Sequence, residues 1–93
     1  MFYALVNTNH LGESFSKVYA CESKRERDSL IDRVNSDARA HASYARHDNG
    51  IWYGRYTKYD SAQAITARDA HKLTRGKTEY DFWSYEGMTV CDL

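Results

Sequence analysis

The chain has 93 residues, with 13 basic and 13 acidic side chains and a formal net charge of zero. This balance excludes a nonspecific DNA coat protein, which would be basic, and a globally acidic DNA mimic. The hydrophobic share of 42% excludes a disordered chain, and no apolar run approaches the ~20 residues that span a bilayer. The length predicts a single domain, residues 1–93, with a radius of gyration of roughly 12 Å if it is compact.

The two cysteines, Cys21 and Cys91, are too few for the disulfide framework of a small secreted domain. The first residues also lack the basic lead and long apolar stretch of a signal peptide. We therefore expect a reducing, cytoplasmic setting, with both thiols free. One disulfide stays open as an alternative if the strands that carry the cysteines pair.

The first predicted elements are two strands, 2–7 and 15–22, which form an antiparallel hairpin across a polar loop with Gly12 as its turn residue. In the second strand, alternation places Tyr19 and Cys21 on one face and Val18 on the other.

A helix is predicted next, because Ser23 and Glu26 form a capping-box pattern before an apolar stripe that includes Leu30 and Val34. We expect this helix to end between residues 35 and 39.

Residues 40–59 predict a second hairpin, because Asp48-Asn49-Gly50 is a strong turn signal. Residues 51–59 read as one strand, whereas 40–47 fit either a strand or an extension of the helix. A helix of about ten residues then begins near Thr66 and stops at Gly76. A final hairpin joins 79–85 to 88–91 around Glu86-Gly87. Together these elements predict an α+β fold, an antiparallel sheet built from hairpins with two short helices.

The sequence carries no phosphate-binding loop, dinucleotide fingerprint, zinc-protease motif or nucleophile elbow. Its histidines, His10, His41, His47 and His71, are scattered and lack metal-ligand spacing, so we expect no metal and no catalytic residue. A histidine-dependent ribonuclease or toxin is a further alternative, which growth arrest on expression and its loss in a His-to-Ala variant would reveal.

Aromatic and basic residues interleave in the predicted strand 51–59. This pattern is typical of single-stranded nucleic-acid or RNA binders, which stack bases on rings and pair phosphates with cations. The alternative is a strand whose aromatics fill the core. The candidate residues for this binding mode are Trp52, Tyr53, Arg55, Tyr56 and Lys58.

The C-terminal part of the sequence is acidic and aromatic, and it follows a basic stretch between Arg68 and Lys77. Trp and Tyr dominate the energetics of protein interfaces, so this part is a candidate contact with a partner protein. The alternative is an ordinary strand with Phe82 facing inward. The candidate partner-binding residues are Glu79, Asp81, Trp83, Tyr85 and Glu86.

Two segments, SKRERDSLI at 23–31 and AITARDAHKL at 64–73, resemble a pattern in small accessory proteins of phages and mobile elements. Such chains begin with a hairpin, continue with a helix headed by a Ser-Lys-x-Glu-Arg-Asp-like run, and later carry the second motif. The resemblance implies an inhibitor of host defence, anti-CRISPR proteins among them, that binds its target without active-site chemistry. The central 48–58 segment is not part of this pattern.

We therefore expect a non-enzymatic protein without cofactor that binds a bacterial defence protein, most simply a CRISPR–Cas effector complex. Its acidic-aromatic surface would cover a nucleic-acid-binding surface of the target, or the protein would block a conformational step. Nucleic acid is the alternative partner, and no membrane partner is expected. A domain this small with so many aromatics could also bury some of them in a homodimer.

Overall fold

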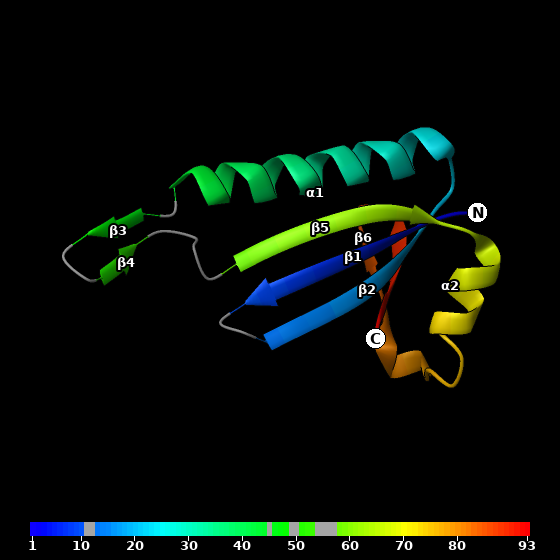
Figure 1. Cartoon of the computed structure of the whole chain (residues 1–93). Coiled ribbons are helices and arrows are strands. Elements are labelled where there is room, and N and C mark those ends of the chain that lie inside the picture. The colour runs from blue at the N-terminus through cyan, green and yellow to red at the C-terminus, as the bar shows by residue number, and fades with distance from the viewer. Residues whose placement is uncertain (11–12, 45, 49–50, 54–57) are drawn as a thin grey trace.

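The computed structural model describes residues 1–10, 13–44, 46–48, 51–53 and 58–93, and side chains at 1–8, 13–36 and 60–93. In this part of the chain, a five-stranded antiparallel sheet and two helices form an α+β fold, as predicted (Figure 1). The strand order is β5-β1-β2-β7-β6, and two further strands, β3 and β4, form a small separate sheet. The strands are β1 (Phe2–His10), β2 (Glu13–Cys21), β3 (Arg46–Asp48), β4 (Ile51–Tyr53), β5 (Lys58–Ile65), β6 (Phe82–Tyr85) and β7 (Met88–Asp92).

The first hairpin is confirmed, but its strands are longer than predicted. β1 and β2 pair from Phe2 and Cys21 as far as His10 and Glu13, so most of the predicted polar loop is strand. The polar residues pair across the hairpin: the Ser16 hydroxyl donates a hydrogen bond to Asn7 Oδ1 at 2.7 Å. Polar cross-strand pairs of this kind stabilise a sheet as apolar pairs do. The polar composition of residues 8–14 therefore does not distinguish a loop from a strand.

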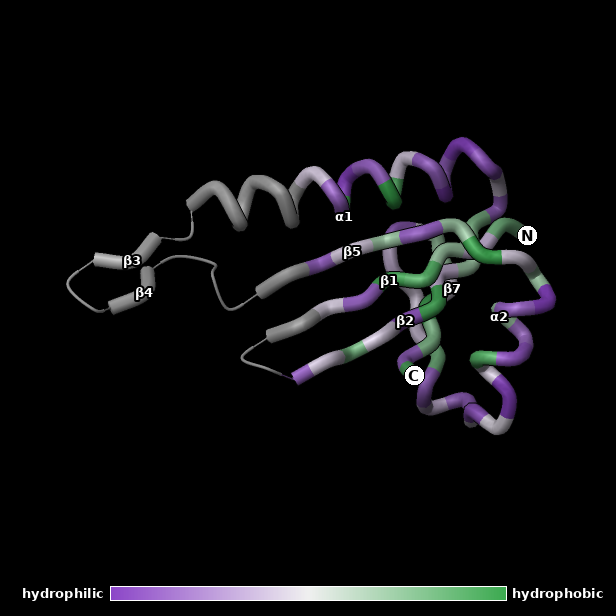
Figure 2. The backbone as a smooth tube through the Cα atoms, in the orientation of Figure 1, coloured by the Kyte–Doolittle hydropathy of each residue, from purple (hydrophilic) through white to green (hydrophobic). Residues whose placement is uncertain are grey.

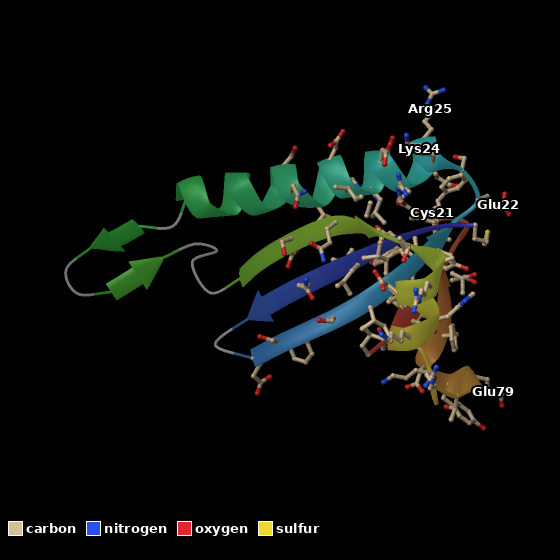
Figure 3. All side chains as sticks on the ribbon, turned by 45° about the vertical axis from the view of Figure 1, so that its right-hand side comes forward. Cys21, Glu22, Lys24, Arg25 and Glu79 are labelled. Carbon is tan, nitrogen blue, oxygen red and sulfur yellow. The ribbon has the colours of Figure 1, made fainter. Side chains whose placement is uncertain are left out.

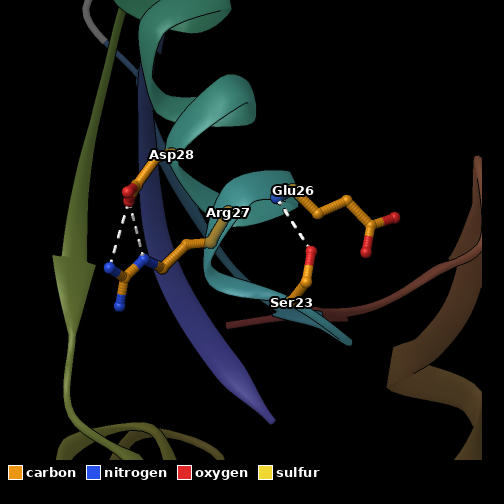
Figure 4. A network of polar contacts seen from close by, with 4 residues as sticks. All are labelled: Ser23, Glu26, Arg27 and Asp28. Carbon is orange, nitrogen blue, oxygen red and sulfur yellow. Dashed lines mark hydrogen bonds and ion pairs between the residues drawn. The ribbon is translucent and has the colours of Figure 1, made fainter.

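Helix α1 (Lys24–Tyr44) begins where the capping pattern predicts. The backbone N–H of Glu26 donates to the Ser23 hydroxyl at 3.1 Å, and Arg27 pairs with Asp28 at 3.0 Å (Figure 4). The predicted end between residues 35 and 39 is wrong, because the helix continues to Tyr44.

Asn35 explains why α1 does not end at the polar stretch in its middle. Its side chain donates to the Ala62 carbonyl at 3.2 Å and accepts from the Ala62 N–H at 3.0 Å. The amide therefore satisfies backbone groups of β5, an edge strand, and is not available to compete with the helix backbone. Alanines then favour helix from residue 38 onward. For residues 40–47 the sequence allowed either a strand or an extension of the helix. In the structure, residues 40–44 are helix, and Arg46 and His47 belong to β3.

The single strand predicted over 51–59 is not formed. Residues 51–53 are β4 in the small sheet, Lys58 begins β5 in the large one, and 54–57 lie outside the described residues. The pairing of Asp48 with Ile51 brackets the predicted turn at Asn49-Gly50, which also lies outside them. The extension of β5 to Ile65 was not predicted, because its Asp, Gln and Ala residues favour strands weakly; pairing with β1 overrides that preference.

The second helix, α2 (Ala67–Leu73), is capped as predicted and is shorter than expected. The Asp69 N–H donates to the Thr66 hydroxyl at 3.1 Å, and Gly76, at φ +81°, follows the end of the helix. The final hairpin is also confirmed, except that the 79–81 portion of its first arm is a 3₁₀ turn, η1 (Glu79–Asp81).

The sheet has a separate apolar cluster on each face, because alternate residues of a strand point to opposite sides. On the α1 face, Leu30 of the helix packs on a buried group of strand residues: Ala4, Val6, Tyr19, Cys21, Met88 and Val90. On the α2 face the buried cluster is smaller: Val18, Ala70 and Cys91. Hydrophobic residues gather where β1, β2 and β7 approach the end of the sheet that carries α2 (Figure 2).

The two cysteines lie on opposite faces of the sheet, both buried and both free. Although β2 and β7 do pair, Cys91 lies opposite Val18 and not opposite Cys21. The alternative of a disulfide between them is therefore excluded by the register.

The molecule is more extended than a compact globule of this length. Its radius of gyration is 14.9 Å, because the end of α1 and the β3–β4 hairpin project beyond the large sheet (Figure 1). Within the described residues, no helix has both the length and the apolar character needed to cross a membrane.

Candidate protein-binding surface

Trp83 and Tyr85 lie side by side on the α1 face of β6, at the edge of the sheet. Helix α1 runs along β5, at the opposite edge of the sheet (Figure 1). Trp83 and Tyr85 are 36% and 41% exposed. Their ring centroids are 6.1 Å apart at an interplanar angle of 66°, an edge-to-face arrangement that aromatic pairs favour. We call Trp83, Tyr85 and the adjoining Glu86 the β6 surface.

Charged neighbours hold Trp83 in place. Its indole N–H donates to Asp92 Oδ1 at 3.1 Å, and the Lys17 ammonium lies 5.3 Å from its ring centroid, within cation–π range. Lys17 and Asp92 are themselves cross-strand neighbours in β2 and β7. An aromatic side chain with its polar edge satisfied and its ring exposed can bind a partner with little loss of conformational entropy.

Glu86 links this edge of the sheet to α1. Its carboxylate pairs with Arg33 Nη1 at 3.1 Å, with both side chains about half exposed. Glu86 also has a φ of +48° and precedes Gly87 at φ +81°, as a two-residue hairpin turn between Tyr85 and Met88 requires. Glycine and asparagine adopt this conformation more readily than glutamate, so the turn retains glutamate at some cost in strain.

The other two predicted acids are not part of the β6 surface. Asp81 Oδ2 accepts hydrogen bonds from the Thr78 N–H at 2.9 Å and from the Thr78 hydroxyl at 3.3 Å, so this carboxylate caps η1. Glu79 lies at the opposite end of β6 from the Glu86 turn, away from the start of α1 (Figure 3). Four strand residues separate the two ends, about 13 Å.

Sequence reasoning missed the basic half of this site. Lys17 comes from β2 and Arg33 from α1, far from Trp83 in the chain, and only the strand order brings them together. It also missed Tyr80, although this residue lies within the acidic-aromatic C-terminal part of the sequence. Tyr80 is in η1 and is 89% exposed. Phe82, considered as an inward-facing residue, points to the α2 face and is 42% exposed.

The residues proposed for nucleic-acid binding are divided between two sheets. Trp52 and Tyr53 belong to β4 and Lys58 to β5, whereas Arg55 and Tyr56 lie outside the described residues. The strand that was to align all five is therefore not formed. Their role in binding stays a prediction, since the described side chains do not include these positions.

Among the histidines, the described side chains include only that of His71, which packs edge to face on Tyr3 at 6.0 Å. No group of three or more His, Cys, Asp or Glu residues that could hold a metal ion occurs in the part of the chain described.

Among the titratable groups of the described residues, three that are buried have a shifted pKa. Burial raises the pKa of Tyr19, with a further contribution from neighbouring Tyr85 and an opposing one from Arg33. Burial also raises the pKa of Cys21 and, together with Asp81, that of Cys91. A raised thiol pKa keeps both cysteines protonated and poor nucleophiles at neutral pH.

Comparison of the chain with protein-family models, with curated proteins and with solved structures gave no match.

Proposed function

We propose that the chain is a non-enzymatic accessory protein of a phage or mobile element that inhibits a bacterial defence complex by direct protein binding. The observation that carries the binding role is the exposed, edge-to-face Trp83–Tyr85 pair, fixed by Asp92 and Lys17. The partner class, a CRISPR–Cas effector, is supported by the resemblance of segments 23–31 and 64–73 to such accessory proteins.

The β6 surface has the composition of an interface centre. Energetically dominant interface residues are enriched in Trp and Tyr and are surrounded by polar groups that exclude water. Here charged side chains of both signs surround the aromatic pair: Lys17, Arg33, Glu86 and Asp92. A rim of this kind favours one partner over others through charge complementarity.

The mechanism we propose is coverage of a nucleic-acid-binding surface of the target. The contact is centred on Trp83 and Tyr85, with Glu86 as its acidic group. Glu79 and Glu86 lie at opposite ends of β6, so any contact of Glu79 with the target is separate from the central one. Asp81 is engaged in capping η1, so charge reversal there would test folding and not binding.

The test compares Trp83→Ala with Tyr80→Ala. Both substitutions remove an exposed aromatic ring, but only the first lies on the β6 surface. Tagged proteins are used to recover partners from bacterial lysates carrying different CRISPR–Cas systems, with and without nuclease. We expect wild type and Tyr80→Ala to recover one effector complex in stoichiometric amount despite nuclease, and Trp83→Ala to bind it at least about 30-fold more weakly.

Circular dichroism and urea denaturation of each variant establish that it is folded. Should folded Trp83→Ala bind the effector as tightly as wild type, the β6 surface is not the interface. Recovery of nucleic acid alone, lost on nuclease treatment, would instead support the alternative of a nucleic-acid-binding module that uses the 51–59 segment.

A further inference from the structure

The two edges of the large sheet, β5 and β6, differ in how their outward backbone groups are satisfied. On β5, the N–H and C=O of Ala62 both bond to the Asn35 side chain of α1, at 3.0 and 3.2 Å. The amide takes the position that a neighbouring strand would take, and α1 runs along this edge (Figure 1). An edge covered in this way does not readily pair with another chain.

β6 has no cover of this kind. It pairs with β7 in continuous register, from Phe82 opposite Cys91 to Tyr85 opposite Met88. The residues next to a two-residue turn exchange both backbone hydrogen bonds, and the pattern then alternates along the ladder, so the N–H and C=O of Ser84 point away from β7. Among the described residues, neither of these two groups has a hydrogen-bond partner.

The side chains of β6 do not prevent pairing with a further strand. Edge strands commonly carry a lysine, a proline or a bulge that blocks the addition of another chain. β6 has the sequence FWSY, which includes neither charge nor proline, and all four residues are exposed. Because the strand is short, its backbone offers few hydrogen bonds, and the three aromatic side chains must supply much of the contact.

A second copy of the chain supplies a strand that matches this edge. An antiparallel arrangement about a two-fold axis at Ser84 sets the two Ser84 residues opposite each other, so that each N–H meets the other copy's C=O. The same register sets Trp83 of each copy opposite Tyr85 of the other, on the α1 face. Aromatic pairs in this cross-strand position stabilise a sheet. Glu86 then lies opposite Phe82 of the second copy, so no acid is set directly opposite another.

The charge of the chain and the position of α1 both permit this self-association. The formal net charge is zero, so two copies do not repel each other as strongly charged chains do. Helix α1 lies along the opposite edge of the sheet and leaves β6 open (Figure 1). An uncharged, self-complementary edge therefore fits a second copy better than it fits a strongly charged segment of another protein.

We propose that two copies of the chain pair antiparallel through β6, centred on Ser84, and join their five-stranded sheets into one. The pairing lies in the plane of the sheet, so the Trp83 and Tyr85 rings of both copies gather on one face. The two β6 surfaces thereby form a single surface with four rings. The dimer is a property of the isolated chain and does not depend on the proposed defence-complex partner.

The test is sedimentation velocity of the isolated protein from about 10 μM to about 1 mM, where wild type should shift from monomer to dimer. Ser84→Lys sets two lysines directly opposite each other and should weaken dimerisation at least about ten-fold. Thr89→Lys is the matched control, because Thr89 is exposed, lies opposite Ser84 and is one strand in from the edge. Its two lysines would be about 14 Å apart, beyond the screening length, so this variant should dimerise as wild type does.

Three results of this experiment would overturn the proposal. A wild-type chain that stays monomeric does not self-associate, and Ser84→Lys that dimerises as well as wild type places the contact elsewhere. Equal weakening by both lysine variants would reflect charge in general and not strand pairing. If wild type is monomeric and Ser84→Lys nevertheless fails to bind the effector, the edge receives a strand of the target instead. Ser84→Pro removes the outward donor and keeps the bonds to β7, so it provides the answer if circular dichroism shows that Ser84→Lys does not fold.

Hydrogen exchange and NMR test the register. The Ser84 amide should exchange rapidly in dilute protein and slowly in concentrated protein, whereas the Ala62 amide, bonded to Asn35, should exchange slowly in both. In a mixture of isotope-labelled and unlabelled chains, we expect contacts between the Trp83 ring of one copy and the Tyr85 ring of the other. A dimer in which the Ser84 amide exchanges as fast as in the monomer would exclude pairing through β6.

Discussion

The two faces of the large sheet differ in how they are covered, although the same strands supply both. The α1 face packs under a helix of 21 residues and, among the described side chains, includes seven buried residues in one cluster. The α2 face packs under a helix of seven residues, with three described side chains buried in its cluster. The β6 surface is on the α1 face, the face with the larger described cluster, and so is a polar hollow of about 290 Å³ between α1 and the sheet.

This difference indicates how a small domain combines a stable core with an exposed candidate binding surface. The large cluster under α1 anchors β1, β2 and β7, and Lys17, Asp92 and Val90 extend from these rigid strands toward Trp83. Binding groups carried by rigid elements keep their geometry better than groups on loops. The α2 face has a more apolar hollow of about 250 Å³ beside Phe82 and Cys91, with fewer polar groups to give it specificity.

The largest expected effect comes from removing a leucine from each helix. Leu30 of α1 is 3% exposed and Leu73 of α2 is 42% exposed. Leu30→Ala should lower the free energy of unfolding by about 3 kcal/mol, because it leaves a cavity in the larger cluster. Leu73→Ala should lower it by less than about 1 kcal/mol. Urea denaturation measures both; equal losses would mean that the two faces contribute alike to stability.

The helix caps provide a matched comparison of intermediate size. Ser23 and Thr66 each accept a hydrogen bond of 3.1 Å from the N–H three residues later. Ser23→Ala and Thr66→Ala should each cost about 1 kcal/mol. The consequences for amide hydrogen exchange should differ: the short α2 should open locally in Thr66→Ala, while α1 stays protected in Ser23→Ala. Similar protection of both helices would show that α2 is as firmly docked as α1.

Alkaline pH tests the burial of one thiol on each face. Both pKa values are raised in the folded protein above the ordinary value of 9.0, so the thiols of the unfolded chain ionise first. This contribution to stability is complete below pH 9.0 and is lost as the pH rises through the folded pKa values. Thermal melts between neutral pH and pH ~10.5 should show the decline, and Cys21→Ala and Cys91→Ala should each reduce it. If the melting temperature of one variant falls with rising pH as steeply as that of wild type, the thiol removed in that variant does not cause the loss of stability.

The smallest expected effect on stability is at the β6–β7 turn. Glu86→Asn replaces a residue at positive φ by one that tolerates it, and removes an exposed ion pair worth little. The free energy of unfolding should stay equal or rise by up to about 0.5 kcal/mol. Binding to the effector should nevertheless weaken, since the variant removes the acid of the β6 surface. A loss of stability would indicate that the Arg33–Glu86 pair is structural, and unchanged affinity would exclude Glu86 from the interface.

Local sequence signals predicted most of the fold. Ser23 and Thr66 mark the two helix starts, alternation assigns Tyr19 and Val18 to opposite faces, and Glu86-Gly87 marks the last turn. These features depend on neighbouring residues, which the sequence displays directly. The errors occur where contacts with residues far away in the sequence determine the secondary structure. Asn35 hydrogen-bonds to β5 and so does not end α1, and β5 is a strand because it pairs with β1.

The candidate site was predictable only in part for the same reason. Trp83, Tyr85 and Glu86 are consecutive or alternate positions of one hairpin, so their proximity follows from the strand itself. Lys17 and Arg33 reach the site through the order β1-β2-β7-β6 and the path of α1, which no local pattern specifies. For Asp81, the sequence did not reveal the hydrogen bond with Thr78, because an acid near a helical turn can be a cap as readily as a contact residue.

The strand order also has a consequence for how the chain folds. β1–β2 and β6–β7 are hairpins of neighbouring strands, which can form in about 1–10 μs. The pairing of β1 with β5, in contrast, must wait for the whole segment between Cys21 and Lys58 to close on itself. Because the entropy of such closure grows only slowly with length, inserting residues between β3 and β4 should slow folding little. Substitutions in β1, which pairs with both β2 and β5, should slow it most.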